Sequence, residues 1–135
     1  MSNGPLEVSA GFHMDRGSKR PESVSAGFDV AGVPGGYYTS ATRQPSGRFK
    51  THLLYTRSLP GDAPATTIKC RGLKVRTLQA LYELAVPRRC MKKATTTARI
   101  RAFFLADDRR LGYDQPYGQV DAYWTYWTQA TPRGA

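Results

Sequence analysis

Three stretches in the middle of the chain, residues 49–55, 66–75 and 98–105, carry apolar residues at every second position. A period of two is typical of a half-buried β-strand, because successive side chains point to opposite faces of a sheet. The second stretch is interrupted by Gly72, which indicates a bulge or tight turn between two short strands.

Two other stretches have the spacing of a helix. Apolar residues stand at i, i+3, i+4 and i+7 from Leu78 to Ala85, which predicts an amphipathic helix over 77–85 that Pro87 ends. The same spacing recurs from Val120 to Trp127. The run 123–128 also alternates well enough for a strand, but we favour a helix.

The first 47 residues are rich in Gly, Pro and Ser and have no sustained period, so they predict a flexible arm. The pentapeptide VSAGF occurs in this arm at 8–12 and again at 24–28. The repeat is either coincidental low complexity or a pair of identical segments that dock into equivalent grooves of a symmetric assembly. If the arm is ordered, Phe12 and Phe28 are the residues expected to anchor it.

The predicted fold is therefore α+β. We expect a small antiparallel or mixed sheet backed by one or two helices in residues 48–135, preceded by the flexible N-terminal arm 1–47.

The distribution of charge also separates residues 1–47 from the middle of the chain. The protein has 20 Lys and Arg against 10 Asp and Glu, a net charge of +10, yet residues 1–47 hold four of each sign. Residues 48–110 hold 15 basic groups against four acidic ones. An excess of this size attracts polyanions, so a partner such as RNA is expected to bind the middle of the chain.

The remaining composition narrows the class of protein. No apolar run approaches the length of a membrane span, no secretory signal is visible, and we expect no membrane partner. Cys70 and Cys90 are too few for a disulfide framework and too isolated for a zinc site, which fits a reducing, cytoplasmic compartment. Cys90 lies among four cations, so it is either a reactive thiol of lowered pKa or, as we favour, an inert one.

In the predicted strands the apolar residues point one way and basic residues the other. Each Lys or Arg could belong to an ordinary solvated face, but three such strands together predict a basic sheet surface for a phosphate backbone. The candidate RNA-binding residues are Lys50, His52, Arg57, Lys69, Arg71, Lys74, Arg99 and Arg101, with Arg88, Arg89, Lys92 and Lys93 in a basic loop. Because no base-reading motif is present, recognition by shape and charge is expected.

Trp124 and Trp127 are candidates for stacking on an exposed base. The alternative, which we favour, is that both tryptophans pack in the core or at a dimer seam.

The stretch 49–57, followed in order by 67–75 and 76–81, resembles the RNA-silencing suppressors of tombusviruses over about 25 residues. The resemblance implies a homodimer in the host cytoplasm that clamps duplex RNA on a basic sheet, with Lys50, Arg57, Lys69 and Arg71 on the backbone and the helix 77–85 behind the sheet. Two features depart from the family pattern. This chain has only a Pro-rich loop where the family has a helix, and its W-x-x-W pair is C-terminal rather than before the first strand.

No catalytic constellation can be assembled, because His13 and His52 have no suitable nucleophile and acid in order. We therefore expect a non-enzymatic RNA-binding protein, with duplex RNA favoured, that uses no metal, cofactor or small-molecule substrate. The main alternative is a structural protein of an RNA-containing particle, either a ribosomal protein or a small viral capsid subunit.

Overall fold

The computed structural model describes residues 1–13, 21–57, 65–78, 81–95, 97–106, 109–110 and 128–131. In these residues the chain is built almost entirely of antiparallel β-strands arranged in two sheets. No helix in the described part of the chain is long and apolar enough to cross a membrane.

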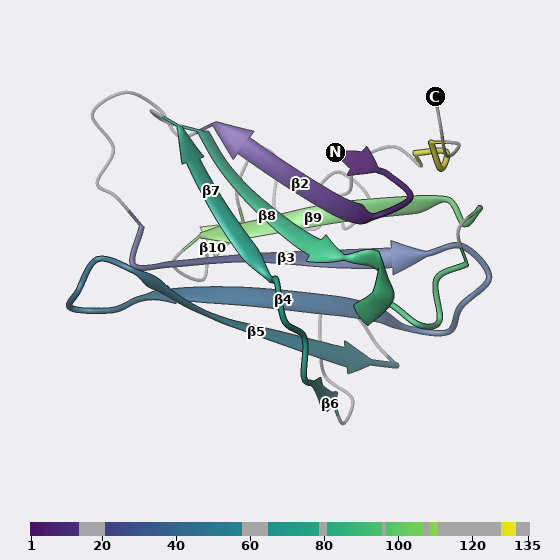
Figure 1. Cartoon of the computed structure of the whole chain (residues 1–135), viewed down its shortest axis with the longest axis horizontal. Helices are drawn as coiled ribbons and strands as arrows, with labels where there is room; N and C mark the ends of the chain where they lie inside the picture. Colours follow the sequence, from purple (N-terminus) through teal and green to yellow (C-terminus); the bar gives the residue numbers. More distant parts are fainter. Residues whose placement is uncertain are drawn as a thin grey trace.

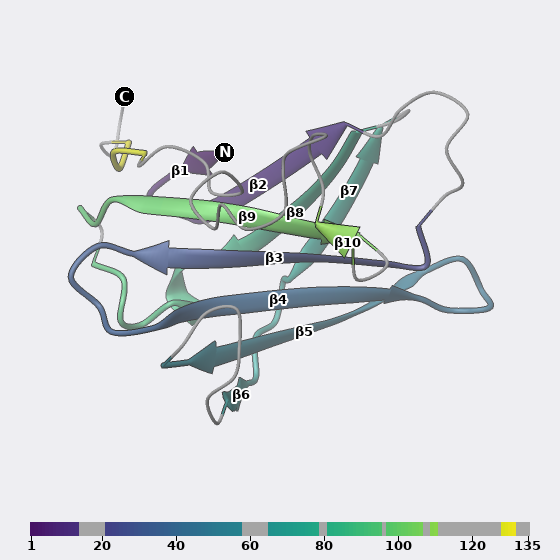
Figure 2. The ribbon, with the colours of Figure 1, turned by 180° about the vertical axis from the view of Figure 1, so that it is seen from behind.

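The larger sheet has six strands (Figures 1 and 2). Their order across the sheet is β10 (Arg109–Arg110), β9 (Ile100–Ala106), β3 (Ser23–Val30), β4 (Gly36–Arg43), β5 (Phe49–Thr56) and β6 (Ala65–Ile68). The strands β3 to β6 follow one another as a meander, and β9 returns later in the chain to pair with β3.

The smaller sheet has four strands. Their order is β1 (Ser2–Asn3), β2 (Glu7–His13), β8 (Leu81–Pro87) and β7 (Lys74–Leu78). A short 3₁₀ helix, Arg88–Cys90, follows β8 directly. Figure 1 shows β2, β8 and β7 crossing obliquely over the six-stranded sheet, so the fold is a two-layer β-sandwich.

The core lies between the two sheets. On β3 the alternate residues Val24, Ala26 and Phe28 are completely buried, and Leu84 and Val86 of β8 reach the same cluster from the other layer. The core is thus formed where one face of each sheet is covered by the other sheet.

The prediction of an α+β fold is wrong, because the described residues form two antiparallel sheets and no helix among them backs a sheet. Residues 77–85, predicted as a helix, instead contribute the end of β7 and most of β8. Tyr82, Leu84 and Val86 are buried at alternate positions, whereas Leu78, which the helical stripe would bury, is 71% exposed. The helix does not form because β8 pairs along its whole length with β2, about 70 residues earlier in the chain. Local periodicity carries no information about such long-range pairing.

The expectation of a flexible N-terminal arm is also overturned. Residues 1–47 supply β1 and β2 to the smaller sheet and β3 and β4 to the larger one. The two VSAGF copies lie in β2 and β3, in different sheets, and their Val and Ala residues are completely buried in the shared core. Phe28 is buried as expected of an anchor, and the side chain of Phe12 lies outside the described residues.

Several strand predictions are confirmed. The stretch 49–55 is β5, the stretch 98–105 largely coincides with β9, and 66–75 is divided into β6 and the start of β7 by a turn. Gly72 lies in that turn with a φ of 94°, a conformation that favours glycine. The predicted helix 120–127, with Trp124 and Trp127, lies outside the described residues.

Candidate nucleic-acid interface

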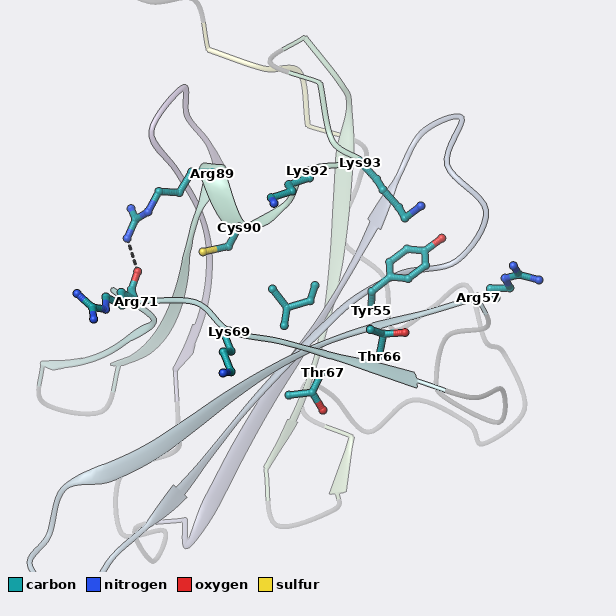
Figure 3. A pocket seen from close by; sticks show the side chains of 11 residues that line it. Tyr55, Arg57, Thr66, Thr67, Lys69, Arg71, Arg89, Cys90, Lys92 and Lys93 are labelled. Atoms are coloured by element: carbon teal, nitrogen blue, oxygen red, sulfur yellow. Dashed lines mark hydrogen bonds between the residues drawn. The ribbon is translucent and has the colours of Figure 1, made fainter.

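One hollow of about 810 Å³ opens beside β6 and the 3₁₀ helix (Figure 3). Six cations line it, from three segments of the chain, and no acidic residue is among its described lining residues. We call this hollow the basic groove. Its cations are Arg57, Lys69, Arg71, Arg89, Lys92 and Lys93.

A disulfide joins the two segments that carry most of these cations. Cys70 and Cys90 are bonded with their Cα atoms 5.8 Å apart. Lys69 and Arg71 flank the first cysteine, and Arg89 precedes the second. The crosslink therefore holds cations that would otherwise repel one another on the same wall of the groove.

The disulfide corrects the sequence interpretation of the cysteines as two thiols. Among the described residues no free cysteine remains. Disulfides persist in oxidising surroundings and are rare in the cytosol. The compartment of the protein stays a prediction from the sequence.

Two further features bring the β6–β7 turn against the residues that follow β8. The Arg89 guanidinium donates a hydrogen bond to the Arg71 carbonyl, drawn as the dashed line in Figure 3. A Cβ added at Gly72 would stand 3.3 Å from Pro87 Cγ and 3.4 Å from Arg89 Nη2. The absence of a side chain at Gly72 thus lets the β6–β7 turn lie against the residues that follow β8.

One aromatic side chain, Tyr55, lines the groove on the side away from Arg71 and Arg89 (Figure 3). Tyr55 near the end of β5 packs against Tyr37 of β4, with ring centroids 5.4 Å apart and ring planes at 60°. The Lys93 ammonium lies 4.9 Å from the centre of the Tyr55 ring, a cation–π contact. The Lys93 backbone N–H donates to the Tyr37 hydroxyl at 2.9 Å, and burial raises the pKa of Tyr37.

A second hollow of about 530 Å³ adjoins the first. Tyr55, Arg57 and Lys93 line both hollows, and the turn around Pro34 lines only the second. Gly35 in that turn has a φ of 77°, and a Cβ there would fall 2.0 Å from the Thr56 carbonyl oxygen. Only glycine allows the turn to pack this closely against the end of β5.

Half of the twelve predicted binding residues are outside the groove. Lys50 and His52 are exposed on β5, on the side opposite the buried Leu53, and Lys74 is exposed on β7. Arg99 is exposed just before β9.

Arg101 and Arg88 are bound within the fold. Arg101 donates to Asp29 at 3.0 Å across neighbouring strands. Arg88 is 6% exposed, and its guanidinium donates to the Asn3 side chain, to the Gly4 carbonyl at 3.1 Å and to the Thr95 carbonyl at 2.5 Å. Desolvation lowers the pKa of Arg88 from its ordinary value.

Sequence reasoning missed the role of Tyr55 in the groove, and it missed the disulfide between Cys70 and Cys90. Tyr55 was recognised only as an apolar position of a strand. The cysteine pair did carry a signal, because each cysteine is adjacent to cations and a bond between them brings those cations together.

Neither a scan against protein-family models nor searches of curated proteins and of solved structures find a match for this chain. The assignment of a function therefore rests on the groove.

Proposed function

We propose that the protein binds RNA, without sequence specificity and without catalysing a reaction, by holding phosphates in the basic groove. The observation that carries the proposal is the gathering of six cations around one hollow with no acidic residue among its described lining residues. A charged side chain that is buried for structural reasons is normally paired with an opposite charge or a hydrogen-bonding group of the protein. The cations of the groove instead face an open hollow, where an external anion can reach them.

The ion pairs between described residues support the same interpretation. They join Arg76 to Glu7 and Glu83 and Arg101 to Asp29, and none includes a cation of the groove. A phosphate backbone supplies the repeated negative charge that such an uncompensated cluster attracts.

The setting that we propose is an RNA-containing particle in which this chain is a structural subunit. The resemblance to tombusvirus suppressors implies a sheet backed by a helix, but the corresponding residues here form β7 and β8, which cover the larger sheet as a second layer. A suppressor that acts as a duplex-clamping homodimer in the host cytoplasm is the other outcome of the experiment below.

The experiment is a titration of fluorescent single-stranded RNA, duplex RNA and duplex DNA of equal length at about 50 mM and about 200 mM salt. The variant combines Lys69→Ala, Arg71→Ala and Lys92→Ala, which removes three cations of the groove. The matched control combines Arg48→Ala, Lys50→Ala and Lys74→Ala, which removes three exposed cations elsewhere. Both variants therefore have the same net charge.

We expect the groove variant to lose affinity for RNA and to lower the slope of log affinity against log salt by about 2 to 3, one phosphate's share for each cation. The control variant should keep most of the RNA affinity and most of the salt slope. Equal losses in the two variants would show attraction by net charge alone and would overturn the groove proposal. Light scattering separates the settings, since a stable dimer with duplex preference indicates a suppressor and growth into large assemblies indicates a particle subunit.

A further inference from the structure

Tyr55 occupies the boundary between the two hollows. It lines both the basic groove and the adjoining hollow, as do Arg57 and Lys93. In Figure 3 Lys93 lies above its ring, Arg57 to the right of it and Thr66 below it. An extended ligand that passes from one hollow to the other would therefore cross this ring next to both cations.

The ring is held in place from two directions. Its hydroxyl donates a hydrogen bond to the Pro34 carbonyl, and its carbons pack against Tyr37. An aromatic ring that is already fixed loses little conformational freedom when a ligand stacks on it. Tyr55 is half-buried, so the remaining surface of the ring is available to the hollows that it lines.

The wall of the groove also contains apolar groups. Ile68 and Cys90 of the disulfide line the basic groove together with Tyr55. A ligand that is only a chain of phosphates would gain nothing from these groups, whereas a nucleobase has an apolar face and a charged backbone attached to it. The combination of cations with an aromatic ring is the usual design for binding unpaired nucleotides.

The size and shape of the groove favour an unpaired strand over a duplex. A hollow of about 810 Å³ has the size of a site for a small organic ligand. An RNA duplex keeps its bases stacked inside and presents phosphates and sugar hydroxyls on its outer surface. Its bases could not reach Tyr55 in such a hollow, whereas the bases of a single strand can turn out of their stack.

We infer that the ligand of the basic groove is single-stranded RNA, with one unpaired base stacked on Tyr55 and the neighbouring phosphates on Arg57, Lys93 and the cations beyond them. The inference rests on the proposed RNA-binding function and replaces the duplex favoured by the sequence. In the free protein the Lys93 ammonium lies over the Tyr55 ring. A base that stacks there displaces this ammonium, which is then free to pair with the neighbouring phosphate.

The experiment compares a single-stranded oligoribonucleotide with an oligonucleotide of the same length that carries abasic sites. Both have the same phosphates, so a difference between them reports contacts with bases. We expect the native protein to bind the intact strand about 5- to 150-fold more tightly, because one stacked base contributes about 1 to 3 kcal/mol. Tyr55→Leu should remove most of this preference and leave the salt slope unchanged, whereas Tyr55→Phe, which keeps the ring, should retain it.

A second measurement uses the native protein alone, in case Tyr55→Leu does not fold. A single strand in which the fluorescent base 2-aminopurine stands between two abasic sites has no neighbouring base to quench it, so a loss of its fluorescence on binding reports stacking on the protein. Equal affinity for intact and abasic strands, or no quenching, would overturn the inference while the groove variant still tests the proposed function. Tighter binding of duplex RNA would overturn it too, and failure of every nucleic acid to bind would remove both proposals.

Discussion

Arg76 and the cations of the basic groove lie close together in the sequence and have opposite electrostatic surroundings. Arg76 on β7 donates to Glu7 of β2 and to Glu83 of β8, at 2.7 Å and 2.6 Å, and so connects three strands of the smaller sheet. Lys69 and Arg71, a few residues earlier, face a hollow with no acidic residue among its described lining residues. In the described part of the chain Arg76 is paired within the fold, whereas the six cations of the groove have no ion pair with another described residue and lie where an external anion can bind.

Arg88 is the most deeply buried of the paired cations and should give one of the two largest effects on stability. Arg88→Ala is expected to lower the free energy of unfolding by about 3 kcal/mol, because the Asn3 side chain and the Gly4 and Thr95 carbonyls lose their donors in a buried site. Urea unfolding followed by circular dichroism measures the change. Its neighbour Arg89 is exposed, so Arg89→Ala is the matched control and should leave the unfolding midpoint nearly unchanged.

If Arg88→Ala had the same free energy of unfolding as the control Arg89→Ala, the structural role assigned to Arg88 would be contradicted. A loss of RNA affinity in folded Arg88→Ala would likewise place this residue with the groove cations.

The disulfide joins the two halves of the comparison, because it is a structural bond that positions the binding cations. Its loss should destabilise the protein by about 3 kcal/mol, as expected for a crosslink between residues 20 positions apart. It should also weaken RNA binding, since Lys69 and Arg71 are then no longer held beside Arg89. Urea unfolding and RNA titration, each with and without a phosphine reductant, measure the two effects.

The control for reduction is the variant with both Cys70→Ser and Cys90→Ser, whose stability and affinity should not respond to the reductant. Mass analysis that finds two free thiols in the untreated protein would contradict the bond itself.

Arg76 should give the smallest of these effects. Arg76→Ala is expected to cost about 0.5 to 1 kcal/mol of stability, because its side chain is 45% exposed and solvent screens its ion pairs. RNA affinity should fall only slightly, through the change in net charge. An RNA salt slope reduced as much as in a groove variant would contradict the division between paired and unpaired cations.

The same site predicts a dependence of stability on pH. The hydrogen bond from Arg76 lowers the pKa of Glu7 in the folded protein. Glu7 therefore adds stability above its unfolded pKa, and this contribution is lost as the pH falls through the lower, folded value. Urea unfolding from neutral pH to about pH 3 should show a smaller acid loss in Arg76→Ala than in the native protein. Equal acid losses would assign the pH dependence to other carboxylates.

The strand predictions held where one face of a single strand is covered by the core. In β5 the buried Leu53 alternates with the exposed His52, and this contrast is visible in the sequence because burial selects residue type directly. Gly72 was also identified correctly, since a backbone angle that favours glycine leaves its mark on a single position. The helix predicted over 77–85 was wrong because pairing of β8 with β2 decided its conformation.

The sequence by itself determined the strongly basic middle of the chain, the period of β5 and β9, and the candidate cations for RNA. It could not separate Arg89, which lines the groove, from Arg88, which is buried next to it. Only the tertiary structure decided that six of the twelve candidates meet around one hollow, that a disulfide holds two of their segments together, and that Tyr55 faces them. The physical reason is that composition and periodicity are properties of neighbouring residues, whereas a binding site depends on where segments far apart in the chain are brought together by sheet pairing.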